Sequence, residues 1–152
     1  MPFFFAFIVV MGMCGITAQT VLARELLIIF SGNELSIGIM IGNWILWGAI
    51  GSYLGGRIVG NGGPPDRIAP AALLLSSCLF PAAIYTVRLF KELAVIPTEV
   101  GTGIPTIFSA SLLLLMPTSL LHGVAFGVAC SFADGASPRA SPAGTVYSLD
   151  AL

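Results

Sequence analysis

Charge is scarce in this chain of 152 residues: 9% of the residues are charged and 57% are hydrophobic. Because a soluble domain carries roughly a quarter of charged residues, the composition excludes a water-soluble globule. Six basic and seven acidic residues leave a net charge of −1, which lacks the positive potential that nucleic-acid binding requires. We therefore expect an integral membrane protein whose first partner is the lipid bilayer, with no nucleic-acid partner.

The motifs of soluble catalysis are also missing. The sequence contains no CxxC pair, no phosphate-binding glycine loop and no GxSxG elbow. Its three cysteines, Cys14, Cys78 and Cys130, fall in separate apolar segments, which favours packing over a disulfide or a metal site. We therefore expect no catalytic domain, no metal and no cofactor in these residues.

Long apolar runs are what the sequence has in abundance. A helix needs about 20 apolar residues to cross the hydrocarbon core, and such runs cover approximately residues 3–30, 35–57, 67–90 and 101–133. Most charges lie at the ends of these runs, where they cost least. The pattern predicts an all-α integral membrane protein. Residues 1–133 would form an up-and-down bundle of four transmembrane helices, similar to half of a transporter.

The connections set the direction of the helices. Glycine and proline at residues 60–65 end the second run and reverse the chain, so the second and third helices should be antiparallel. Residues 134–143 resemble a Pro/Ser/Gly linker, and residues 144–152 either begin a further helix or are a truncated end. The first run has no basic segment before it and no small-residue cleavage site, so we expect it to be retained.

Small residues mark the second run as a packing helix. At 100° per residue one face of it holds Gly38, Gly42, Ala49, Ser52 and Gly56, and a second patch holds Gly48, Gly51 and Gly55. Small residues allow close backbone approach in lipid, so we expect a central helix packed on two sides. In the fourth run, Pro117 predicts a kink over residues 113–117, which serves either to line a cavity or simply to fit the helices together.

A cluster of polar residues follows the first run: Gln19, Arg24, Glu25, Asn33 and Glu34. One interpretation is that Arg24 and Glu25 flank a membrane span at its interface, where arginine can snorkel. The other is a buried network in which Arg24 pairs with Glu34 or Glu25, while Gln19 and Asn33 supply hydrogen bonds. Both interpretations remain open from the sequence.

The chain has a single histidine, His122, in an apolar stretch just after Pro117. A lone histidine in a membrane helix can bind a haem or a quinone or relay protons. The alternative is a packing histidine whose hydrogen bonds are satisfied, and this alternative is favoured. A haem held by two histidines of this chain is excluded.

Four stretches carry a family resemblance. They are Q-x-x-x-x-R-E-L-L from Gln19, F-S-G-N-E-L-S-I-G from Phe30, W-x-x-x-G-A-x-G-S-x-L-G-G-R from Trp44, and G-T-V-Y-S-L-D-A-L from Gly144. Together they resemble the N-terminal transmembrane region of membrane-embedded spermidine synthase-like proteins, which are polyamine aminopropyltransferase-like. The resemblance implies further helices and a soluble domain for aminopropyl transfer in full-length relatives. It also implies a bacterial-type inner membrane and a cytoplasmic N-terminus.

Two functions follow as expectations. The first is a membrane module of a spermidine synthase-like protein without the catalytic domain, which provides structure, docking or a ligand-shaping surface. The second is a small accessory subunit of a larger membrane complex with no catalysis of its own. A downstream reading frame for a methyltransferase-like domain would favour the first, and stoichiometric co-purification with other membrane subunits the second.

Overall fold

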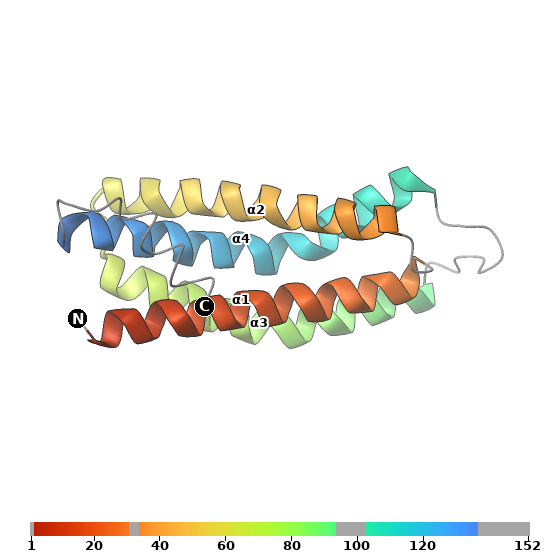
Figure 1. Ribbon diagram of the computed structural model, residues 1–152, viewed down its shortest axis with the longest axis horizontal. Coiled ribbons are helices and arrows are strands. Elements are labelled where there is room, and N and C mark those ends of the chain that lie inside the picture. Colours follow the sequence, from red (N-terminus) through yellow and green to blue (C-terminus); the bar gives the residue numbers. More distant parts are fainter. Residues whose placement is uncertain (1, 31–33, 94–102, 137–152) are drawn as a thin grey trace.

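The protein folds into four long helices that lie side by side (Figure 1). The structure is a computed structural model, and it describes residues 2–30, 34–93 and 103–136. The helices are α1 (Pro2–Ile29), α2 (Glu34–Gly60), α3 (Pro65–Leu93) and α4 (Ile104–Ala136). Helix α4 extends three residues into the predicted linker 134–143; the rest of that linker and residues 144–152 lie outside the described residues.

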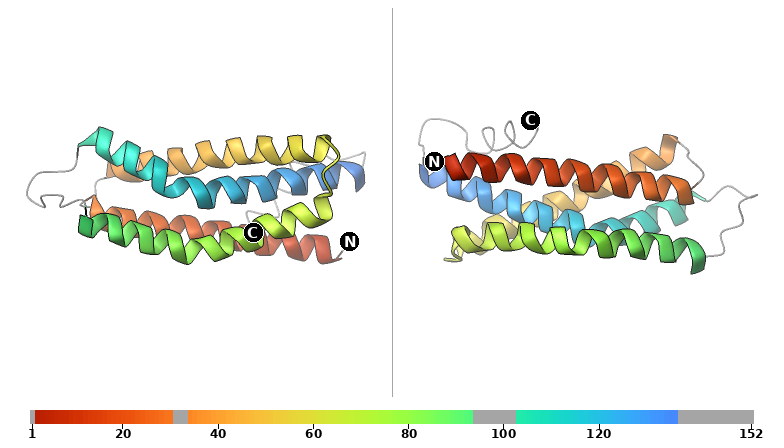
Figure 2. Two further views of the ribbon diagram at one scale, coloured as in Figure 1. Left: turned by 180° about the vertical axis from the view of Figure 1, so that it is seen from behind. Right: turned by 90° about the horizontal axis from the view of Figure 1, so that it is seen from below.

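All four helices are long and apolar enough to span a bilayer. The spanning segments are Phe5–Ile29, Glu34–Gly60, Pro65–Phe90 and Ile104–Ser131. Consecutive helices run in opposite directions, so the turn between α2 and α3 lies at the same end of the bundle as the N-terminus (Figures 1 and 2). The predicted all-α fold of four membrane helices is confirmed, and the chain is a multi-pass membrane protein.

The turn between α2 and α3 follows directly from its glycines and prolines. The amide of Gly63 donates to the carbonyl of Ile58, and the amide of Gly62 donates to Val59. Gly62 adopts a φ of 88°, so these bonds form a Schellman motif, which favours glycine at its left-handed residue. Pro65 then begins α3, where its missing amide hydrogen costs nothing, and the chain reverses within a few residues.

Helix α4, and not α2, is the central helix. It lies between α2 on one side and the pair α1 and α3 on the other (Figure 1). Accordingly, 44% of the residues in the apolar stretch of α4 are buried, against 28% in that of α2. The prediction that the second helix is central and packed on two sides is therefore wrong. The periodicity of its small residues identified two smooth faces on α2. It did not indicate whether other helices of the same chain pack against both faces.

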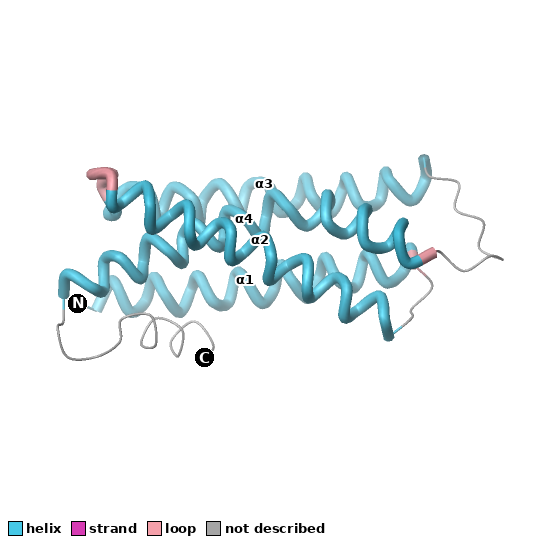
Figure 3. The backbone as a smooth tube through the Cα atoms, turned by 90° about the horizontal axis from the view of Figure 1, so that it is seen from above, coloured by secondary structure: helices cyan, strands magenta, loops and turns pink. Residues whose placement is uncertain are grey.

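Helices α2 and α4 touch backbone to backbone where they cross (Figure 3). A Cβ atom added to Gly123 would collide with the carbonyl oxygen of Gly48, and one added to Gly127 with that of Ser52. On the other helix, Gly51 lies against the carbonyl of Leu120 in the same way. Small residues on both helices thus remove the side chains that would hold the backbones apart.

The face that makes this contact is the second patch of α2. Its members Gly51 and Gly55 are buried against α4. Of the face first predicted for packing, Ser52 and Gly56 lie near α4, whereas Gly38, Gly42 and Ala49 are exposed. No described atom lies within 4 Å of a Cβ atom added to Gly38 or Gly42. That part of the predicted packing face is therefore uncovered by the described helices.

Hydrogen bonds reinforce the contact between α2 and α4. The Asn43 amide donates to the Ser111 hydroxyl at 2.8 Å and to the Phe108 carbonyl at 3.2 Å. Further along, the Trp47 indole donates to the carbonyl of Leu112 at 2.8 Å. In the other direction, from α4 to α2, Ser119 donates to the Trp44 carbonyl at 2.6 Å. Because lipid offers these groups no partner, such bonds help to fix the position of α2 on α4.

Pro117 lies inside α4, at the place where the sequence predicts a kink. It lacks an amide hydrogen, so the carbonyl of Leu113 loses its usual helical donor. The helix remains continuous through the proline and bends along its length (Figure 1). Helix α4 contacts α2 on both sides of the proline, at Ser111 before it and at Gly123 after it.

We predict that Gly123→Ala destabilises the bundle by about 1–3 kcal/mol, because the added methyl group forces α2 away from α4. The matched control is Gly42→Ala, whose methyl group meets no described atom; it should be neutral or stabilise the helix by about 0.5–1 kcal/mol. Unfolding by sodium dodecyl sulfate in mixed micelles, followed by circular dichroism, measures both. Equal effects of the two substitutions would contradict the close contact.

Candidate functional site

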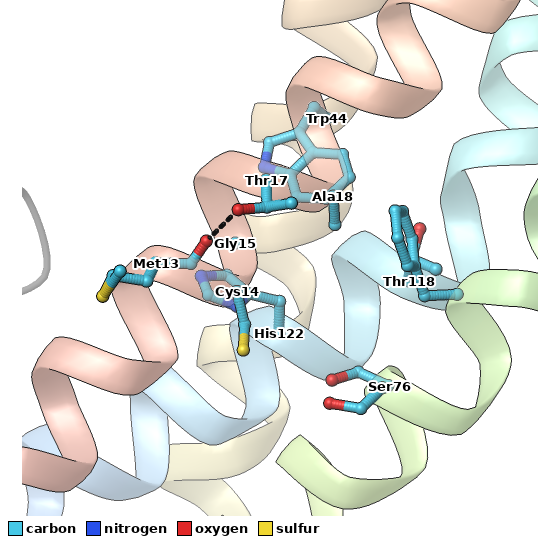
Figure 4. Close-up of a pocket in the computed structure, with 11 residues that line it drawn as sticks. Met13, Cys14, Gly15, Thr17, Ala18, Trp44, Ser76, Thr118 and His122 are labelled. Carbon is cyan, nitrogen blue, oxygen red and sulfur yellow. Dashed lines mark hydrogen bonds between the residues drawn. The ribbon is translucent and has the colours of Figure 1, made fainter.

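The apolar core is divided into two clusters, and a cavity lies between them. One cluster surrounds Leu22, Leu26 and Met40, and the other surrounds Ile8, Met11 and Ala125. The cavity has a volume of about 240 Å³. All four helices contribute to its lining, which consists of Met13, Cys14, Gly15, Thr17, Ala18, Trp44, Ser76, Ser77, Phe80, Thr118 and His122 (Figure 4).

The cavity lies near the middle of the bilayer. At a rise of 1.5 Å per residue, Gly15 is about 20 Å from either end of α1, and His122 is more than about 20 Å from either end of α4. A hydrocarbon core is roughly 30 Å thick, so the cavity falls close to its midplane. Polar groups at this depth are expensive, and functional sites are where they are most often retained.

His122 packs its ring against the backbone of α1. A Cβ atom added to Gly15 would lie 2.5 Å from Nε2 of His122 and in collision with Cε1, so only glycine leaves room for the imidazole. On the other side, the ring centroid of Trp44 is 6.4 Å from that of His122, with the planes inclined at 41°. Three helices thus hold one imidazole beside the cavity (Figure 4).

The hydroxyl groups of the cavity use their own hydrogens on their own helices. Thr17 donates to the carbonyl of Met13 at 2.7 Å, and Thr118 donates to that of Leu115 at 3.3 Å. Ser76 and Ser77 both donate to the carbonyl of Leu73, at 2.8 Å and 2.9 Å. A hydroxyl that donates in this way still has lone pairs, so the cavity is rich in acceptors.

The imidazole of His122 differs from these hydroxyls. Within the described part of the chain, neither of its nitrogens has a hydrogen-bond partner. A neutral imidazole has one donor and one acceptor. The His122 side chain lines the cavity, and the ring edge that carries both nitrogens lies against Gly15 of α1. The ring packs against Gly15 and Trp44, and none of the described residues satisfies its hydrogen bonds.

Pro81 adds a further acceptor near the cavity. Its ring lies inside α3 and has no amide hydrogen, so the carbonyl of Ser77, one turn earlier, lacks its usual helical donor. Ser77 itself lines the cavity. This proline therefore leaves a backbone carbonyl without its helical donor next to the site.

The polar cluster predicted between α1 and α2 has a different arrangement. Glu25 accepts two hydrogen bonds from Arg88 of α3, from Nε at 3.1 Å and from Nη2 at 2.8 Å. This ion pair takes the place of the predicted pairing of Arg24 with Glu25 or Glu34. Both residues lie within about two turns of the ends of their helices, and Arg88 is 65% exposed. The pair therefore joins α1 to α3 at the edge of the bundle, as in the interfacial interpretation.

Of the other residues of that cluster, Arg24 and Glu34 lie near this end of the bundle, and Gln19 lies about 15 Å from the end of α1. Arg24 and Glu34 are exposed, and Gln19 is half-buried on α1. No hydrogen bond joins these three to one another among the residues that the structure describes. Asn33 lies outside the described residues.

We predict that Arg88→Gln lowers the thermal midpoint of the detergent-solubilised protein, because it removes the bidentate partner of Glu25. Arg24→Gln is the matched control and should leave the midpoint unchanged. Added sodium chloride should reduce the difference in thermal midpoint between the two variants, because it screens an ion pair that faces solvent. A loss for Arg24→Gln as large as that for Arg88→Gln would restore the network centred on Arg24.

Comparison with protein-family models, with curated proteins and with solved structures finds no match for this chain. The chemistry of the cavity therefore rests on the residues of this chain alone, and the relationship to spermidine synthase-like proteins stays a prediction.

Proposed function

We propose that this protein is a membrane-embedded binding module that holds a small, neutral molecule in the cavity at the middle of the bilayer. The observation that carries the proposal is His122, which lines the cavity and has no hydrogen-bond partner among the described residues. A polar group without a hydrogen-bond partner costs several kcal/mol in the hydrocarbon core, where no water can replace the missing partner. A ligand that bonds to the imidazole offsets this cost.

The composition of the lining supports binding of a small ligand. Apolar side chains such as Met13, Trp44 and Phe80 form much of the wall, and a few hydroxyl groups converge with His122. An apolar cavity with a few placed polar groups is typical of small-molecule sites. The volume of about 240 Å³ lies just below the usual range for drug-sized ligands, so the ligand is small.

This proposal develops the ligand-shaping role expected from the sequence. In a spermidine synthase-like protein, we propose, the four helices would be the membrane module, and aminopropyl transfer would belong to the soluble domain of a full-length relative. The candidate binding cavity lies within one chain and is lined by all four of its helices, so binding does not require that domain.

We predict that the protein purified in mild detergent carries a small-molecule adduct in native mass spectrometry. Ala18→Leu should remove most of the adduct, because Ala18 lines the cavity and the larger side chain fills it. Ala71→Leu adds the same atoms on an exposed part of α3 outside the lining and should keep the adduct. Loss of the adduct from both variants, or from neither, would contradict binding at this cavity.

The accessory-subunit alternative has an observation of its own. The exposed small residues Gly38, Gly42 and Ala49 leave one face of α2 smooth and uncovered by the described helices. Such a face suits close approach of another membrane helix. Under this alternative, other subunits in the membrane would cover it.

We further propose that the protein resides in a bacterial-type inner membrane with its N-terminus and the turn between α2 and α3 in the cytoplasm. This orientation rests on the family resemblance, because the basic residues of the sequence do not favour either side.

We predict that a cysteine placed at Asn61 reacts with a membrane-impermeant maleimide only in inside-out vesicles, and one at Gly103 only in right-side-out cells. Both positions are exposed and lie at opposite ends of the bundle. The native cysteines lie within the spanning segments, where the reagent does not reach. The reverse labelling pattern would overturn the orientation.

A further inference from the structure

The cavity reaches the surface of the bundle sideways and not through its ends. Its exposed lining residues are Met13 and Thr17 on α1 and Ser77 on α3. Helices α1 and α3 flank this side, and α4 lies behind them (Figure 2). Because these residues are near the middle of their helices, the opening faces the hydrocarbon core of the bilayer. A ligand that enters here arrives from the lipid.

The lining excludes a charged ligand. Among the residues that the structure describes, no Asp, Glu, Lys or Arg side chain contributes to the cavity. The ion pair of Glu25 and Arg88 belongs to a different pocket at the edge of the bundle. An ion held without a countercharge in this apolar setting would pay a large desolvation cost. Polyamines and phosphate esters therefore do not fit the site.

The polar groups favour a ligand that donates a hydrogen bond. The hydroxyl groups of Thr17, Ser76, Ser77 and Thr118 use their hydrogens on backbone carbonyls, so they offer lone pairs to the cavity. His122 adds one acceptor nitrogen and one donor N–H. A ligand hydroxyl group suits these polar groups, because it can donate to one of their acceptors and also accept from the N–H of the imidazole.

The apolar part of the lining favours a flat ring. Trp44 and Phe80 present aromatic side chains to the cavity, and the His122 ring lies at 6.4 Å from the Trp44 ring between centroids. Trp44 and Phe80 can each attract a ligand's aromatic ring edge to face or offset, at centroid separations of about 4.5–7 Å. Gly15 and Ala18 leave space beside them.

Building on the proposed binding function, we infer that the ligand is a neutral, lipid-dissolved molecule with a hydroxylated aromatic ring, of the phenol or quinol class. Its ring lies between Trp44 and Phe80, and its hydroxyl group hydrogen-bonds to His122. Any apolar tail leaves through the opening between α1 and α3 into the lipid.

The two tryptophans of the chain provide the test. Trp44 lines the cavity, whereas Trp47 donates to Leu112 of α4 and does not line it. In Trp47→Phe, Trp44 is the only tryptophan and reports on the cavity; in Trp44→Phe, Trp47 reports on the ligand dissolved in the lipid. Both variants are placed in lipid nanodiscs at pH 7 and titrated with 4-bromophenol, a neutral ring whose bromine quenches tryptophan fluorescence.

A matched pair of ligands isolates the hydroxyl group. We expect 4-bromophenol to quench Trp44 saturably, at a concentration about tenfold lower than 4-bromoanisole, which has the same ring without the donor. The substitution His122→Phe in the Trp47→Phe background should abolish this difference. Trp47 should show weak quenching that does not saturate and does not distinguish the two ligands.

The outcomes separate the ligand class from the binding function. Equal quenching of Trp44 and Trp47, or equal potency of the phenol and its ether, overturns the phenol or quinol class. If the adduct that depends on Ala18 is still present in native mass spectrometry, the binding function stands with a different ligand. If that adduct is also absent, both proposals fail. If a linear polyamine saturably protects Trp44 from quenching by 4-bromophenol, the exclusion of charged ligands is overturned.

Discussion

The backbone contact between α2 and α4 is the interaction on which the rest of the bundle depends. Glycines on both helices let each backbone reach the carbonyls of the other, as between Gly123 and Gly48. This closeness brings Asn43 and Trp47 within hydrogen-bonding distance of α4. In a bilayer, where burying apolar side chains gives little drive for helices to associate, close packing and such hydrogen bonds supply the stability.

The same contact creates the conditions for the cavity. Once α2 and α4 form a tight pair, α1 and α3 pack on the other side of α4 through larger side chains in two separate clusters. Between the clusters the lining includes small or hydroxyl-bearing residues such as Gly15, Ala18 and Ser76. The cavity and its hydroxyl groups therefore lie together near the middle of the bilayer, beside His122, the one histidine of the chain.

The polar cluster shows where inference from spacing stops. Arg24, Glu25 and Glu34 are close in the sequence and suggest a network with one another. The structure instead joins Glu25 to Arg88, which is 63 positions away in the chain. A helix directs adjacent residues to different sides, so the partner of Glu25 depends on which helix packs against that side. For the same reason, no local signal in the sequence identified Thr17, Ser77 or Thr118 as neighbours of His122.

By itself the sequence determined the membrane environment, the four apolar spans, the reversal between the second and third helices and the small-residue character of α2. These features depend on composition and local periodicity, which act over a few turns of one helix. Only the tertiary structure decided that α4 is central, which face of α2 it covers, and that His122 lies beside a cavity without a partner among the described residues. Such features require knowing which helices are neighbours, and apolar surfaces that all suit lipid do not specify this.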